Sequence, residues 1–380
     1  MRLWPRRRRW DVAPFPTDDL LVTEDVLRRN VEDLMTVRDR QIQGGAIVFR
    51  GDLRVEPARA LDLMLARFKP FGYTPFLRSS QGQSAVQAVP LKEVTVPSRV
   101  RLSVGLFLLT CLSTLLAGAV FFGSPTVAGP ATSPVLAWLL SGAPFAATLL
   151  AILTTHEFGH YFTARYYKAS VSLPYFIPAP PPLFVGTLGA VIRMRSPVSN
   201  RNALFDIAAA GPLAGLVIAI PAIMLGLQWS MVAPVHAGAV SFGDSLLMRF
   251  LVYTQFGSIP AGSDVFVHPV AIAGWFGLLI TALNLFPVGQ LDGGRIAYAL
   301  FGRWHGLVGK VTFAALLALG AITRSPNWVV WAALIFFLIG FHHSPPLDDV
   351  TPLSRGRRVV GALCLVLLVL LVPPVPIQLS

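Results

Sequence analysis

Residues 155–160 read Thr155-His156-Glu157-Phe158-Gly159-His160 and lie near the end of an apolar run over residues 140–166. On a helix, residues four positions apart share one face, so His156 and His160 can reach a single cation together. Glu157 is then placed to act on a water molecule bound to that cation. An ionised carboxylate in a lipid-facing helix costs roughly 2.5–3.5 kcal/mol on insertion scales, so a purely structural role for Glu157 is unfavourable.

A structural alternative is that His156 and Glu157 only form hydrogen bonds to neighbouring helices. This alternative predicts no further acidic residue at membrane depth. After residue 100 the acids are Glu157, Asp206, Asp244, Asp264, Asp292, Asp348 and Asp349. Asp206 is expected at the start of a helix, where the helix dipole stabilises a carboxylate, and four others fall in polar loops. Asp292 is therefore the second acid expected at depth.

Asp292 lies in a stretch that interrupts an apolar helix. This stretch runs from Asn284 to Gly294 and contains Pro287 and several glycines. Unwound backbone at membrane depth needs a reason, and bringing a side chain to a metal is a good one. Two imidazoles and one carboxylate leave tetrahedral zinc a fourth position for water, as in catalytic sites. The sequence therefore predicts one Zn²⁺ per chain, bound by His156, His160 and Asp292.

Such a zinc site implies hydrolysis of a peptide bond, with Glu157 as the general base. The Asn284 amide is expected to hold a substrate carbonyl or oxyanion, although it could equally be a polar residue of helix packing. A competing function is a metal or proton transporter that uses the same His/Asp cluster. Transporters usually contain internal repeats, and neither motif occurs twice in this chain. A third reading is a catalytically silent membrane chaperone that contains no zinc.

The composition indicates a membrane protein with a polar head. The chain is 54% hydrophobic and 13% charged, against about 25% charged in soluble domains. Residues 1–100 hold 29 of the 50 Asp, Glu, Lys and Arg residues. Apolar stretches long enough to cross a bilayer predict about seven spans. These spans are expected near residues 101–122, 140–166, 204–227, 267–286, 306–323, 327–342 and 358–376.

Two segments between the spans need separate predictions. The stretch Pro174 to Pro197 is too rich in proline for a helix, and we expect a re-entrant or interfacial β-hairpin that includes residues 183–192. Residues 245–256 have helical spacing and could lie in the membrane interface or form an eighth span.

The distribution of positive charge orients the chain. The loop 123–137 has no charged residue, whereas arginine and lysine cluster between the second and third predicted spans and recur on that side. The positive-inside rule therefore places the head in the cytoplasm. Because these arginines flank apolar runs, the net charge of +12 does not indicate nucleic-acid binding. Cys111 and Cys364 both lie in apolar runs, so no disulfide framework is expected.

Residues 1–100 are expected to form a small α+β module. Helical spacing extends loosely over residues 17–43, a β-rich run follows at 46–51, and 57–68 predicts an amphipathic helix. Short strands are expected at 73–77 and 84–88. The head lacks histidine and cysteine and has no catalytic spacing, so our hypothesis is a regulatory or substrate-gating role.

Several segments together resemble the site-2 proteases, zinc metalloproteases that cut substrates within the membrane. The resemblance covers roughly residues 140–300. It rests on His156-Glu157-Phe158-Gly159-His160, Gly186-Thr187-Leu188-Gly189-Ala190, Ala210-Gly211-Pro212-Leu213-Ala214-Gly215 and the stretch from Asn284 to Gly294. It implies a polytopic α-helical membrane protein with a catalytic core at about 140–300 of a transmembrane domain 101–380. It also implies regulated intramembrane proteolysis of a membrane-anchored protein, with Glu157 activating water and Asn284 helping to hold substrate.

Within that family the head resembles the ethylene-dependent gravitropism-deficient type and its bacterial relatives, through Arg50-Gly51-Asp52-Leu53-Arg54. The outer loop 228–265 is too short for the PDZ-like domain of other members. The resemblance implies an integral protein of the bacterial cytoplasmic membrane, with the lipid bilayer and a membrane-anchored protein as partners. The oligomeric state is not predicted.

Overall fold

The computed structural model describes residues 17–80, 82–90, 99–123, 133–180, 185–234 and 240–379. Within these ranges the chain forms two compact units. The first contains residues up to Pro97 together with 196–204 and 344–353, and the second contains 98–195, 205–343 and 354–380. The arginine run 6–9 and residues 183–184 of the expected hairpin lie outside the described residues.

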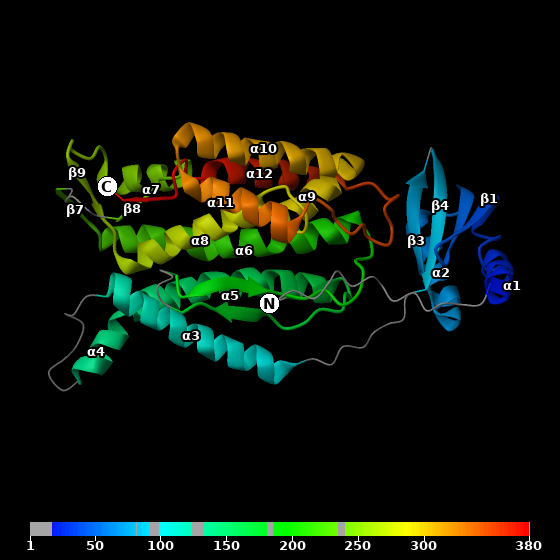
Figure 1. Cartoon of the computed structure of the whole chain (residues 1–380), viewed down its shortest axis with the longest axis horizontal. Coiled ribbons are helices and arrows are strands. Elements are labelled where there is room, and N and C mark those ends of the chain that lie inside the picture. The colour runs from blue at the N-terminus through cyan, green and yellow to red at the C-terminus, as the bar shows by residue number, and fades with distance from the viewer. Residues whose placement is uncertain are drawn as a thin grey trace. The chain divides into compact units, whose positions relative to one another are not determined.

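The first unit is built on a four-stranded antiparallel sheet in the order β1-β2-β4-β3 (Figure 1). Its elements are α1 (Thr17–Arg29), β1 (Met35–Gln43), β2 (Ala46–Leu53), α2 (Pro57–Phe68), β3 (Tyr73–Ser80) and β4 (Gln83–Pro90). Leu27 of α1 and Phe68 of α2 are buried in one core with Phe49 of β2. The expected α+β architecture is therefore present.

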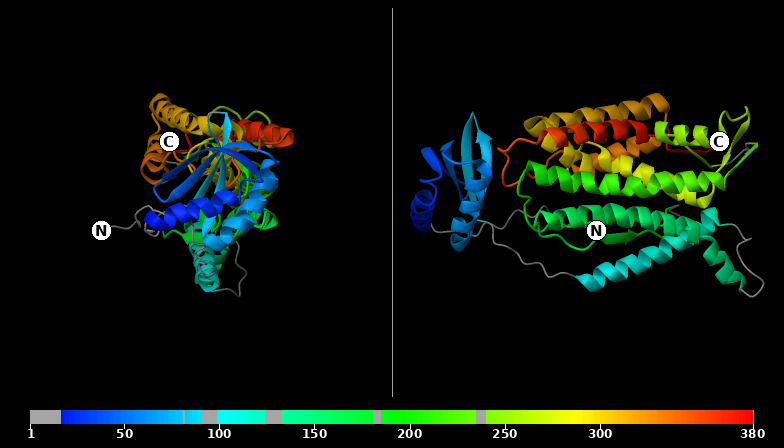
Figure 2. Two further views of the ribbon diagram at one scale, coloured as in Figure 1. Left: turned by 90° about the vertical axis from the view of Figure 1, so that its right-hand side faces the viewer. Right: turned by 180° about the vertical axis from the view of Figure 1, so that it is seen from behind.

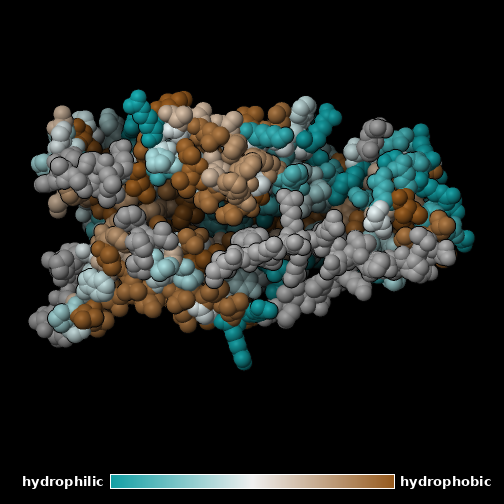
Figure 3. All heavy atoms as spheres, viewed as in Figure 1, coloured by the Kyte–Doolittle hydropathy of each residue, from teal (hydrophilic) through white to brown (hydrophobic). Residues whose placement is uncertain are grey.

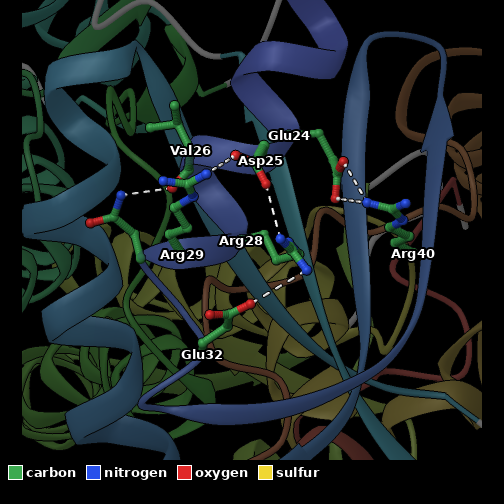
Figure 4. A network of polar contacts seen from close by, with 8 residues as sticks. Glu24, Asp25, Val26, Arg28, Arg29, Glu32 and Arg40 are labelled. Atoms are coloured by element: carbon green, nitrogen blue, oxygen red, sulfur yellow. Dashed lines mark hydrogen bonds and ion pairs between the residues drawn. The ribbon is translucent and has the colours of Figure 1, made fainter.

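The helical expectation for residues 35–43 is wrong, because these residues form β1. Gly44 and Gly45, with φ of 57° and 83°, make the two-residue turn that a tight hairpin needs, and β1 then pairs with β2 along its length. This pairing overrides the weak helical spacing. Glu24, whose side chain is buried, accepts a bond from Arg40 at 3.1 Å and ties α1 to β1, while Arg28 and Arg29 pair within α1 with Asp25 (Figure 4).

Two short segments far along the chain extend this sheet beyond β3. The Leu77 amide donates to the Leu347 carbonyl at 2.7 Å, and the Asp349 amide donates to the Leu77 carbonyl at 3.1 Å. The Leu347 amide in turn donates to Val198 at 2.8 Å. Segments 196–204 and 344–353 therefore complete the first unit, although the sequence indicated only residues 1–100.

The second unit is helical. Its helices are α3 (Val100–Phe122), α4 (Pro134–Ser141), α5 (Ala143–Tyr166), most of α6 (Arg201–Gln228), α7 (Leu246–Phe256), α8 (Pro269–Leu285), α9 (Asp292–Phe301), α10 (His305–Thr323), α11 (Pro326–Leu334) and α12 (Arg355–Leu371). Helices α5, α6 and α8 run side by side (Figures 1 and 2). Close contacts between Gly159 and Ala210 and between Gly226 and Ala271 hold α6 against α5 and α8.

Four helical stretches are long and apolar enough to cross a bilayer: Val100–Phe122, Pro134–Tyr166, Arg201–Gln228 and Asp292–Thr323. The apolar helices Pro269–Leu285 and Pro326–Ile339 are shorter. Figure 3 shows hydrophobic residues concentrated over the helical unit on the face in view. The chain is a membrane protein, and the count of about seven spans stays a prediction. Helix α7 is about 16 Å long, against a hydrocarbon core of about 30 Å, which favours an interfacial position for residues 245–256.

The proline-rich stretch after α5 contains a hairpin, as expected. Strand β5 (Tyr175–Pro178) pairs antiparallel with β6 (Thr187–Val191), and the described part of residues 174–197 contains no helix. The Ser113 hydroxyl of α3 donates to the Gly186 carbonyl at 2.7 Å and so fixes the hairpin to α3. Two further strand pairs, β7 (Met231–Pro234) with β9 (Ser263–Phe266) and β8 (Val240–Phe242) with β10 (Ile377–Leu379), complete the unit.

Candidate metal centre

Helices α5 and α9 bring together three side chains of the kinds that can bind a metal ion. His156 and His160 lie one turn apart on α5, and Asp292 is the first residue of α9. His160 Nε2 lies 3.1 Å from His156 Nε2 and 3.1 Å from Asp292 Oδ2. His156 Nε2 lies 3.4 Å from the same carboxylate oxygen. Among the described residues this is the one group of three or more such side chains close enough to share an ion.

These distances fit zinc. Ligand atoms about 2.0–2.1 Å from a tetrahedral zinc lie about 3.3–3.4 Å from one another. The three measured separations of 3.1, 3.1 and 3.4 Å are close to that value. All three side chains are largely shielded from solvent, with exposures of 4%, 5% and 12% for His156, His160 and Asp292.

A backbone carbonyl of α6 sets the chemical form of His160. His160 Nδ1 donates to the Ile207 carbonyl at 2.6 Å, because that oxygen can only accept. In neutral His160 the Nε2 atom therefore carries a bare lone pair that faces a carboxylate oxygen and a second imidazole nitrogen. That arrangement is repulsive unless a cation lies between the three atoms, so the donor set fits a bound metal ion.

The turn between α8 and α9 places Asp292 next to the two histidines. Helix α8 ends at Leu285, residues 286–291 form a turn, and α9 begins at Asp292. Gly293 packs so closely on the end of α8 that a Cβ atom there would lie 1.8 Å from the Leu285 carbonyl oxygen. A side chain at Gly293 would push α9 away from α8 and move Asp292 with it. The predicted interruption of the helix at Pro287 is confirmed.

Helix α6 packs closely against α5 at glycine residues near His160. A Cβ atom at Gly211 would lie 2.1 Å from His160 Nε2, and one at Gly159 would lie 2.7 Å from the Ala210 carbonyl oxygen. Glycine at these two positions therefore permits close approach of α5 and α6 at the level of the His160 imidazole.

Glu157 and Asn284 lie beside these three side chains. Glu157 is 6% exposed and close enough for its charge to interact with His156, His160 and Asp292. The Asn284 Nδ2 atom of α8 lies 3.5 Å from His156 Nε2. The structure thus brings all five residues singled out in the sequence to one place.

Other polar residues take structural positions. His268 accepts from the Val270 amide at 3.3 Å and caps α8. His305 is only 4% exposed and packs against Tyr298 and His343. Asp206 does not lie in the first turn of α6. It lies further along and pairs with Arg357 of α12 at 2.6 Å.

Two contacts near these residues were not visible in the sequence. The Ile207 contact uses a backbone carbonyl, which leaves no signal in the residue type. The Asp206–Arg357 pair joins residues 151 positions apart, and Asp206 was expected only at the start of a helix. A charged residue within an apolar helix was the available signal for Asp206.

A buried His-His-Asp group with an adjacent glutamate, set among apolar helices, defines a membrane zinc hydrolase. Comparisons with known proteins agree with this class. Residues 144–323 match the pattern of Peptidase family M50. The chain is 30% identical over 385 residues to probable zinc metalloprotease EGY2, chloroplastic, of Arabidopsis thaliana. This alignment covers 96% of the chain and 67% of the relative.

A second relative is probable zinc metalloprotease EGY1, chloroplastic, of Oryza sativa subsp. japonica. It is 33% identical over 263 residues, 67% of this chain and 45% of that protein. The chain thus spans two thirds of the first relative's length and under half of the second's. None of the solved structures matches the chain. The chain belongs to peptidase family M50, the site-2 proteases, and is a zinc metalloprotease.

Proposed function

We propose that the chain is an intramembrane endopeptidase that hydrolyses a peptide bond of a membrane-anchored protein, in regulated intramembrane proteolysis. We further propose that His156, His160 and Asp292 bind its one zinc ion. The observation that carries the proposal is the convergence of these three ligand atoms within 4.8 Å of one another, between apolar helices. Loss of zinc from Asp292→Asn, with the protein still folded, is the expected result. Full zinc occupancy in this variant would contradict the assignment.

The proposed reaction divides the work between the metal and the chain. Zinc, when bound, would lower the pKa of water to about 7 and polarise the substrate carbonyl. Glu157 accepts the proton of the attacking water and delivers it to the leaving amine. Asn284 donates from its amide to the substrate carbonyl or to the developing oxyanion. Glu157, His156, His160 and Asp292 are each at most 12% exposed, so bulk water screens their charges weakly.

The β5–β6 hairpin supplies a place for an extended substrate. Strand β5 occupies one edge of β6, and within the described residues no other strand pairs with its second edge. A substrate helix unwound at the cleavage point could add as a strand there, through main-chain hydrogen bonds. The variants Leu188→Pro and Ala190→Pro test this, because proline removes one backbone N–H donor from β6. Unchanged KM in both variants would contradict edge pairing.

The transporter alternative is less favoured, because the relatives reported above carry protease names. Glu157→Gln separates the two functions. A protease keeps zinc and loses cleavage of a membrane-anchored reporter, whereas a transporter that only passes ions through the cluster has no cleavage to lose.

We propose a regulatory role for the head, residues 1–100. Segments 196–204 and 344–353 belong to the first unit together with its sheet. The first segment continues into α6 of the protease domain, and the second continues into α12. Arg201 Nε, at the start of α6, donates to Asp349 at 2.8 Å. A ligand that alters the sheet would therefore act on both helix starts. Unchanged substrate choice and rate after deletion of residues 1–95 would contradict this role.

The cytoplasmic position of the head and the bacterial cytoplasmic membrane also remain proposals. They rest on the arginine and lysine residues between the second and third predicted spans. The relatives reported above are chloroplast proteins by name. Labelling of single cysteines placed in the head by a membrane-impermeant thiol reagent tests sidedness, and labelling in intact cells would contradict it.

A further inference from the structure

A charged cluster outside the proposed catalytic groups joins three parts of the second unit. Arg357 binds Asp206 with two parallel bonds, Nε to Oδ1 at 2.8 Å and Nη2 to Oδ2 at 2.6 Å. The Tyr167 hydroxyl donates to Asp206 Oδ2 and accepts from Arg357 Nη2 at 3.1 Å. Tyr167 directly follows α5, Asp206 belongs to α6 and Arg357 to α12.

The geometry of this cluster makes it stronger than an ordinary surface ion pair. Asp206 and Arg357 side chains are 25% and 32% exposed, so solvent screens them only in part. Planar two-point pairing fixes direction as well as distance, and the tyrosine hydroxyl adds a third member. The cluster therefore holds α5, α6 and α12 in one defined register.

That register is the one on which His160 depends. Asp206 directly precedes Ile207, whose carbonyl accepts from His160 Nδ1 at 2.6 Å. Tyr167 lies seven residues after His160, about two helical turns along the same chain segment. The cluster thus joins α5 to α6 within about 11 Å along α5 of the imidazole.

Small displacements between α5 and α6 would matter here. One residue of axial slip moves a helix by about 1.5 Å, enough to break a hydrogen bond between Ile207 and His160. The backbone of α6 also lies close to the His160 ring at Gly211, since a Cβ atom there would lie 2.1 Å from Nε2. The ring is therefore placed by α6 from two directions.

We propose that Asp206 and Arg357 are positioning residues for the metal ligand His160. By locking α6 and α12 to the end of α5, they keep the Ile207 carbonyl in reach of Nδ1 and so keep Nε2 directed at the metal. This inference rests on the proposed zinc site. It gives α12, which carries none of the proposed ligands or catalytic groups, a defined part in metal binding.

The test measures zinc affinity of the purified full-length chain in detergent, by competition with a chelator of known affinity. Arg357→Gln and Asp206→Asn are expected to weaken zinc binding by about 10-fold, the lower end of the range for loss of a group bonded directly to a metal ligand, because both act on His160 through the Ile207 carbonyl. Arg355→Gln removes the same charge from the same turn of α12 at an exposed residue, and is expected to change affinity within about twofold. The double variant Asp206→Asn/Arg357→Gln should bind zinc no more weakly than either single variant, because the two act as one pair.

A purely structural brace gives a different pattern. It would lower the thermal midpoint of the zinc-free protein while the folded fraction bound zinc with parental affinity, and that result would overturn the proposal.

If Arg357→Gln does not fold, the variants Arg357→Lys and Tyr167→Phe test the proposal instead, because each removes only part of the cluster. Both should bind zinc more weakly than the parent, and parental affinity in both would overturn the proposal. His156→Ala is run in parallel, since undiminished zinc binding there would contradict the proposed zinc site itself and not the positioning role.

Discussion

His160 and Asp292 are separated by 132 positions in the sequence, yet His160 Nε2 and Asp292 Oδ2 lie 3.1 Å apart. The contact depends on two local features that act at a distance. A helical spacing of four residues aligns His160 with His156, and the turn between the end of α8 at Leu285 and the start of α9 directs Asp292 toward them.

Glu157→Gln should keep zinc and lose catalysis. The amide is nearly the same size as the carboxylate but cannot accept the proton of water, and removal of a general base typically lowers rate by about 10²–10⁴-fold. Cleavage of a membrane-anchored reporter and zinc content are measured on the same preparation. Substantial residual cleavage at full zinc occupancy would show that another group acts as the base.

Gly211→Ala should weaken zinc binding and reduce cleavage, because its Cβ atom would lie 2.1 Å from His160 Nε2. The matched control is Gly215→Ala, one turn along α6, where the nearest His156 atoms lie 3.4 Å away, an ordinary contact distance. Zinc affinities of the two variants are compared. Equal affinities would mean that α6 does not set the position of the His160 ring.

Asn284→Ala should leave zinc bound and slow cleavage, by about 10²–10³-fold if its amide supports the oxyanion. Separate measurement of kcat and KM shows which role applies, since a group that contacts the oxyanion lowers kcat while a group that only holds substrate raises KM. Parental kcat and KM in this variant would contradict a role in catalysis or substrate binding and leave Asn284 as a residue of helix packing.

His343 should remain neutral across the physiological pH range. Burial, with the nearby charge of Arg295, lowers the pKa of His343 to about 3. The ordinary value is about 6.5, so protonation favours the unfolded chain. The stability contributed by neutral His343 is fully present above about pH 6.5 and decreases as the pH falls toward 3. NMR of ¹⁵N-labelled imidazoles, assigned with His343→Gln, should show no protonation between about pH 4 and 7. A midpoint near 6.5 would contradict this.

Much of the site could be predicted from the sequence, because its signals are local. The spacing of His156 and His160 depends only on helix geometry, and Pro287 with its neighbouring glycines marks the interruption that precedes Asp292. The amphipathic helix at 57–68 was predicted with the bounds that the structure gives.

The remaining features depend on partners remote in the chain. Residues 35–43 became a strand because β2 was available to pair with them, which their own spacing did not reveal. Leu347 joined the first unit through backbone bonds to Leu77, and backbone groups leave no signature in residue type. The Asp206–Arg357 pair needed the three-dimensional arrangement of α6 and α12.

X-ray absorption at the zinc edge tests the central claim most directly. On the purified full-length chain we expect one zinc per chain in four-coordinate geometry, with two imidazole nitrogens at about 2.0–2.1 Å and oxygen ligands at about 2.0–2.2 Å. In His160→Ala the imidazole contribution should fall to a single nitrogen. A zinc ion with sulfur ligands, or an unaltered spectrum in His160→Ala, would contradict binding by His156, His160 and Asp292.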